Sequence, residues 1–151
     1  TMAYITTNQL SARLGSTLYA RLTDRVNGTT ASVTVAQQLI DEAHAEADSY
    51  LAARYATPVD LAARPELLAM LQARVLDLAE YGAWRSSPFV SDLPARVKAL
   101  YANAISWFHE VVRGSVVLPA AAPPPGPQAT SDAPLWQSPP RVINRTTLDG
   151  L

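Results

Sequence analysis

The distribution of proline divides this chain of 151 residues into two parts. Proline fixes φ and has no backbone N–H, so it interrupts a helix interior and favours extended backbone. Most of the 12 prolines lie beyond Leu118, at Pro119, Pro123, Pro124, Pro125, Pro127, Pro134, Pro139 and Pro140. We therefore predict a folded domain over residues 1–118 and an extended, proline-rich C-terminal arm over residues 119–151.

The first part has the apolar periodicity of amphipathic helices, with apolar residues three and four positions apart. A long helix is predicted from Thr34 to about Tyr55, with an inner face of Ala36, Leu39, Ile40, Ala43, Ala47, Tyr50 and Leu51. A second is predicted from Pro65 to about Arg85, with Leu68, Leu71, Val75, Leu78 and Gly82 inside. A third is predicted from near Ser91 or Asp92 to Arg113, with Val97, Leu100, Tyr101, Ala104, Phe108 and Val111 inside and Gly114 as its terminator.

Shorter signals surround these three helices. Thr6 with Gln9 fits a capping box, Gly15 suits the end of a short first helix, and residues 16–24 suit a second. Thr34 with Gln37 fits another capping box. The prediction is an all-α fold, a small bundle of three long helices plus short N-terminal helices.

The arm is not composed like a plain linker. Residues 115–119, "SVVLP", suit a short strand, and the roughly 22 residues of 119–140 could reach up to about 65 Å if extended. Apolar side chains return towards the end, at Trp136, Val142, Ile143, Leu148 and Leu151. A segment that stays in water has no use for such groups, so the arm is predicted to dock on something.

Composition excludes several classes of function. The chain has no cysteine, which removes disulfides, thiol nucleophiles and cysteine zinc sites. The net charge of −1 argues against broad attraction to nucleic acid. No apolar run is long enough to span a membrane, and "TMAYITTNQL" does not have the pattern of a signal peptide, so we expect a soluble intracellular protein.

No arrangement of residues predicts catalysis, a cofactor or a metal. His44, Glu46 and Asp48 are the most enzyme-like group, and His44 and Asp48 share a helix face. Nothing elsewhere in the chain supplies matching ligands, so this group is interpreted as the solvated or neighbour-facing side of a helix, together with Asp41 and Glu42. His109 is interpreted as a structural or surface residue, and the chain is expected not to be an enzyme.

Several segments together resemble a known family. They are "AYITTNQL" with "LTD" at 22–24, "AEADSYLAARYATPV" at 45–59, "VVRGSVVLP" at 111–119 and "NRTTLDGL" at 144–151. With these segments the chain resembles the Mu-like phage head–tail connector (adaptor) proteins over nearly its whole length. The stretch "PAAAPPPGPQATSDAP" has no counterpart in that pattern.

The resemblance implies a structural protein of the virion neck, present in the host cytoplasm during assembly. It implies a ring of twelve copies beneath the portal protein, which extends the DNA channel and carries the tail or its completion protein. DNA would pass without specific binding, and the acidic face of the 34–55 helix is a candidate channel surface. The predicted interface residues are Trp136, Val142, Ile143, Arg145, Leu148, Leu151, Arg54 and Tyr55. The alternative is a helical nucleic-acid-binding module of the DNA-packaging machinery.

Overall fold

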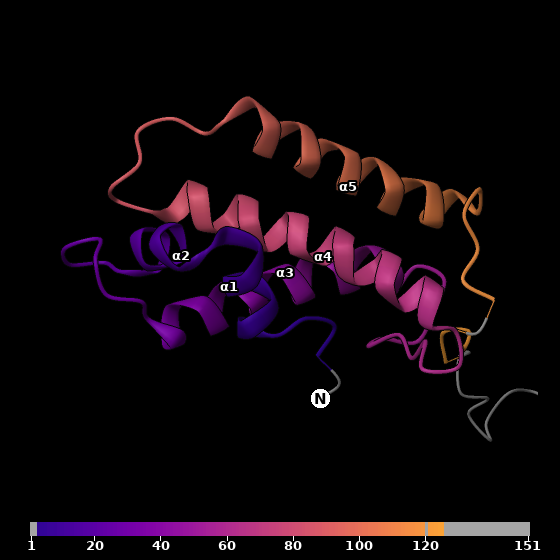
Figure 1. The fold of residues 1–151 in the computed structure, drawn as a ribbon. Helices are drawn as coiled ribbons and strands as arrows, with labels where there is room; N and C mark the ends of the chain where they lie inside the picture. Colours follow the sequence, from indigo (N-terminus) through magenta and orange to yellow (C-terminus); the bar gives the residue numbers. More distant parts are fainter. Residues whose placement is uncertain (1–2, 120, 126–151) are drawn as a thin grey trace, which may run out of the picture.

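The computed structural model describes residues 3–119 and 121–125, and within them every regular element is a helix. The predicted all-α class is confirmed. Figure 1 shows the three longer helices packed together and two short N-terminal helices lying on them. The long helices are α3 (Val33–Leu51), α4 (Pro65–Ser86) and α5 (Ala95–Arg113).

The two short helices begin and end where the sequence predicts. In α1 (Thr7–Leu14) the Thr6 side chain accepts from the Gln9 backbone N–H, and the Gln9 side chain accepts from Thr6 N–H at 2.8 Å. Gly15 ends α1 with φ of 79°, a conformation that other residues rarely adopt. The chain then enters α2 (Ser16–Thr23), and both helices pack on α3 and α4.

The predicted capping box at Thr34 and Gln37 is wrong. The N-cap of α3 is Ser32, whose hydroxyl accepts from Val35 N–H at 3.3 Å, while the Gln37 side chain donates to Asp41. Ser32 also donates a bond, from its own N–H to the Thr23 hydroxyl at the end of α2. This contact fixes the chain just before Val33, so tertiary structure decides between two possible caps.

Two further boundaries differ from the prediction. Helix α3 ends at Leu51, and residues 52–55 continue as turns before the loop that leads to α4. Helix α5 begins at Ala95 because Pro94 is its N-cap, and the residue before a proline is disfavoured in helical backbone. Its predicted end is confirmed, with Gly114 in the left-handed region at φ of 84°.

The predicted strand at residues 115–119 is wrong. Ser115 N–H and Val116 N–H both donate to the Glu110 carbonyl, which turns the chain back over the end of α5. The turn carries Leu118 into the core, where only 1% of it is exposed. A strand would need a partner edge, and the described residues form only helices, turns and irregular backbone.

The core runs through the whole bundle. Its fully buried larger side chains are Ile5, Leu10, Leu22, Ile40, Leu51, Leu61, Leu71, Val75, Val97, Phe108 and Leu118. These residues come from all five helices and from the segments before α1 and after α3 and α5. Close packing of this core therefore fixes the non-helical segments near the arm as firmly as the helices.

Candidate functional site at the arm junction

The beginning of the arm is attached to the segment that follows α3. Leu118 N–H donates to the Tyr55 hydroxyl at 2.8 Å, and this bond is buried. Ala56 N–H donates to the Ala122 carbonyl at 2.9 Å. The bundle therefore holds the chain as far as Ala122. Figure 1 shows the chain after α5 running beside the loop between α3 and α4.

The N-terminal segment is fastened at the same end of α3. The Tyr4 hydroxyl donates to Asp48 Oδ1 at 2.5 Å and accepts from Val59 N–H at 2.7 Å. Tyr4 is 3% exposed, and burial together with the Asp48 bond raises the pKa of its phenol. A phenol that stays protonated can keep both bonds at any physiological pH.

His44 completes this junction as a hydrogen-bond acceptor. Its Nε2 accepts from Ile5 N–H at 3.2 Å, and its ring meets that of Tyr4 edge to face at 5.3 Å. Burial lowers the pKa of His44 and outweighs the nearby carboxylates Asp41 and Asp48. The imidazole is therefore held neutral, which is the form that can accept at Nε2.

These contacts correct the interpretation of the acidic helix face. Asp41 and Glu42 are exposed, as predicted. His44, Glu46 and Asp48 are half-buried and bonded within the chain, with Glu46 accepting from the Tyr101 hydroxyl at 2.8 Å. His109 is exposed and meets Tyr50 edge to face, which confirms it as a surface residue.

The structure describes two of the predicted interface residues, Arg54 and Tyr55, and they differ in exposure. Arg54 is exposed, and its guanidinium lies where a side chain on Gly114 would have to stand. Tyr55 is only 7% exposed and belongs to the core, so its hydroxyl serves the fold. Trp136, Val142, Ile143, Arg145, Leu148 and Leu151 lie outside the described residues, and their role stays a prediction.

The flank of α4 holds a charged cluster that the sequence interpretation missed. Asp77 and Glu80 are buried, with side chains 5% and 1% exposed. Arg13 from α1 pairs with both, and its Nε lies 2.8 Å from Glu80 Oε2. Arg96 from α5 approaches the other Glu80 oxygen at 2.9 Å, and Arg74 lies 3.6 Å from Asp77. The sequence does carry a signal for this cluster, because these two acids stand three residues apart in the otherwise apolar helix segment "VLDLAEYGA".

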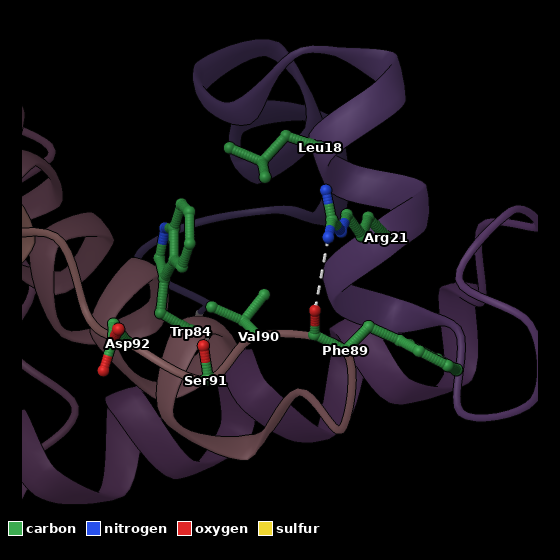
Figure 2. Close-up of a pocket in the computed structure, with 7 residues that line it drawn as sticks. All are labelled: Leu18, Arg21, Trp84, Phe89, Val90, Ser91 and Asp92. Carbon is green, nitrogen blue, oxygen red and sulfur yellow. Dashed lines mark hydrogen bonds between the residues drawn. The ribbon is translucent and has the colours of Figure 1, made fainter.

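A shallow pocket of about 220 Å³ lies at the C-terminal end of α4. Figure 2 shows Leu18 and Arg21 of α2 facing Trp84 and the connection to α5. The Arg21 guanidinium donates to the Phe89 carbonyl at 3.3 Å, and Arg25 donates to the Ser86 carbonyl and hydroxyl. These arginines hold the α4–α5 connection against α2, and the pocket brings no acid–base pair together.

Neither a metal site nor a membrane span is found in the described ranges. Within residues 3–119 and 121–125 no three His, Asp or Glu side chains are close enough to hold an ion. None of the helices there is long and apolar enough to cross a bilayer. What the described structure offers is a helical bundle with a firmly seated exit for an arm.

Comparison with known proteins identifies the family of the chain. No curated protein matches it. The family model described as "Bacteriophage Mu, Gp36" matches residues 4–136, which covers the whole described bundle, the junction and the first part of the arm. The chain therefore belongs to the bacteriophage Mu Gp36 family and is a Mu-like phage protein.

Proposed function

We propose that the chain is a structural connector between the head and the tail of a Mu-like phage. In this role copies of the bundle form a ring beneath the portal protein, and the arms fasten the ring to its partners. The ring extends the DNA channel and carries the tail or its completion protein. We propose no catalytic activity and no cofactor for it.

The observation that carries the proposal is the seating of the arm. Leu118 and Ala122 are bonded to Tyr55 and Ala56, and the bond to Tyr55 is buried, so a pull on the arm is transmitted to the segment that follows α3. A passive linker has no need of such an attachment. The arm then has apolar residues near its end that can bury surface on a partner, namely Val142, Ile143, Leu148 and Leu151.

The distribution of arginine supports a structural role over DNA binding. Arg13, Arg74 and Arg96 pair with the carboxylates of α4, and Arg21 and Arg25 donate to backbone carbonyls. Arginines used in this way have less charge to offer to phosphates. A connector that lets DNA slide benefits when its arginines are engaged within the bundle in this way.

The test is assembly on portal rings of the same phage. Removal of residues 126–151 keeps the Ala122 bond and should leave a folded bundle, with unchanged helical circular dichroism, that no longer joins portal rings in electron micrographs. A matched variant keeps the arm's length but replaces Val142, Ile143, Leu148 and Leu151 with serine, and it should fail in the same way. Normal assembly of both variants would refute the fastening role.

A further inference from the structure

A groove between α3, α4 and α5 has the chemistry of a receptor for arginine. Its volume is about 290 Å³, and it is lined by Leu39, Glu42, Ala43, Glu46, Leu78, Tyr81, Gly82, Arg85 and Tyr101. The apolar side chains Leu39, Ala43 and Leu78 are each at most 4% exposed and lie at its base. The remaining lining residues are two carboxylates, two tyrosine rings, Gly82 and one arginine, Arg85. The guanidinium carbon of Arg85 lies over the Tyr81 ring, 5.9 Å from its centroid.

The rings and the carboxylates are arranged together. Tyr81 and Tyr101 stack with their centroids 4.0 Å apart, and the Tyr101 hydroxyl donates to Glu46. Glu42 is exposed, and neither Glu42 nor Glu46 pairs with a basic residue of the described ranges. Arg85 already lies over Tyr81, which shows that the tyrosine pair accepts a guanidinium. A second arginine could lay its stem against Tyr101 while its nitrogens reach a carboxylate.

Gly82 keeps the groove open. A Cβ at this position would meet Leu39 Cδ2 at 3.7 Å, which is an ordinary contact, and its backbone has no positive φ. Packing therefore does not require glycine here, although glycine weakens a helix interior. The absence of a side chain leaves space beside Glu46 and Tyr81 for another group.

The chain itself supplies a fitting occupant. The arm tip, defined as residues 141–145 ("RVINR"), carries Arg141 and Arg145 on either side of Val142 and Ile143. Its charge is opposite to that of the two glutamates, and its apolar pair suits the base of the groove. We propose that the groove binds the arm tip of its own chain, so that the isolated protein stores its arm on its own bundle.

The geometry of the exit favours the chain's own arm over that of another copy. The arm leaves beside the end of α3, and at 1.5 Å per residue Glu46 and Glu42 lie roughly 8 and 14 Å back along the helix from Leu51. The 15 residues 126–140 would span about 20 Å as a random coil and about 46 Å as extended polyproline-like chain, so their reach covers both glutamates in either case. Linkers that match their span in this way give effective concentrations in the millimolar range, well above ordinary protein concentrations.

The absence of cysteine allows a direct test in the full-length chain. Arg85→Cys places a thiol at the groove and Ile143→Cys places one in the arm tip, while both glutamates and both tip arginines remain. Because Arg85→Cys also removes the guanidinium that lies over Tyr81, the control pair combines Ala73→Cys and Ile143→Cys with Arg85→Ala. Ala73 is an exposed position on α4 outside the groove. Disulfide formation under mild oxidation is followed by mass spectrometry and non-reducing gels.

The groove pair should form an intramolecular disulfide at least ten times faster than the control pair. Adding Glu42→Gln and Glu46→Gln to the groove pair should slow it at least fivefold, since glutamine keeps the acceptor for Tyr101 but removes the charge. Equal rates for the two pairs, disulfide-linked dimers in place of monomers, or no effect of the glutamines would overturn the proposal.

The purpose of arm storage rests on the proposed connector function, but the two can fail separately. A full-length chain that joins portal rings while its groove pair gives no preferential disulfide would refute arm storage alone. A chain that forms the disulfide but never joins portal rings would refute the connector function alone.

Discussion

The arm junction and the flank of α4 both bury polar groups, but they do so by different means. At the arm junction the fully buried groups are neutral donors and acceptors, such as the Tyr55 hydroxyl with Leu118 N–H, and the carboxylate of Asp48 is only half-buried. On the flank of α4 they are charges, with Glu80 between Arg13 and Arg96. The junction joins segments to the bundle, whereas the charged cluster joins helix to helix.

The difference has energetic consequences. A charge removed from water costs far more than a hydroxyl, so a charged cluster is stable only while each member has its partners. A neutral hydrogen bond contributes less when present and leaves a smaller penalty when broken. The cluster on α4 should therefore respond more strongly to a single substitution than the junction does.

The largest expected effect is that of Glu80→Gln. The change keeps the shape but leaves Arg13, with its side chain 25% exposed, beside an uncharged partner. We expect the free energy of unfolding to fall by about 2–4 kcal/mol, the lower part of the range reflecting the partial exposure of Arg13. Urea unfolding followed by circular dichroism measures it.

The control for this prediction is Glu66→Gln. Glu66 pairs with Arg64 at 3.5 Å, and both side chains are more than half exposed. The loss here should stay below about 0.5 kcal/mol because water screens the pair. If Glu80→Gln cost no more than Glu66→Gln, the buried cluster would not be the electrostatic joint described above.

The next effect in size is that of Tyr55→Phe at the junction. The substitution leaves Leu118 N–H buried without its acceptor, so we expect a loss of about 1–3 kcal/mol. Hydrogen exchange at the amides of Leu118 and Ala56 should also quicken, because the start of the arm is released. Tyr50→Phe is the matched control, since the Tyr50 hydroxyl makes no hydrogen bond in the described ranges, and it should change stability by less than about 0.5 kcal/mol. Equal losses for the two variants would show that the Tyr55 hydroxyl does not hold the junction.

The helices were predictable from local signals, and the junction and the cluster were not. The helical periodicity of apolar residues, the capping box of Thr6 and Gln9 and the helix end at Gly114 each depend on residues within about four positions. Such local signals favour the same helix boundaries whatever the rest of the fold. The cap at Ser32 and the bond from Leu118 to Tyr55 depend on segments far apart in sequence, and no local rule selects them.

The same limit explains the errors at the candidate site. Tyr55 is among the predicted interface residues, but it is only 7% exposed and its hydroxyl accepts from Leu118 N–H of the returning chain. Asp77 and Glu80 occupy positions that a helical wheel places beside the apolar stripe, and only the approach of Arg13 and Arg96 shows that they are buried. Long-range pairing of opposite charges leaves no mark on either helix alone.

A titration distinguishes the two regions further. Burial lowers the pKa of His44 below its unfolded value of about 6.5, so the unfolded chain takes up a proton more readily. The stability that neutral His44 contributes is therefore complete above about pH 6.5 and is lost as pH falls towards the folded pKa.

His44→Gln tests this pH dependence, because glutamine can accept from Ile5 N–H but does not titrate. The wild-type midpoint of thermal unfolding should fall between about pH 7.5 and pH 5.5, and the variant should lose less over the same interval. His109→Gln, at an exposed site, should behave like wild type. An identical fall in the His44→Gln variant would mean that other groups at the junction or the cluster produce the acid sensitivity.

The smallest expected effect has the opposite sign and concerns a position in neither polar region. Gly82→Ala should raise the free energy of unfolding by about 0.5–1 kcal/mol, because alanine loses less backbone entropy and its methyl makes only an ordinary contact with Leu39. The same substitution at Gly114 should destabilise the bundle, since there φ is 84° and the guanidinium of Arg54 fills the space. Urea unfolding of the two alanine variants measures whether each change raises or lowers the free energy of unfolding. A gain at Gly82 would show that the bundle's own stability does not require this glycine, and that the groove is kept open at a cost to α4.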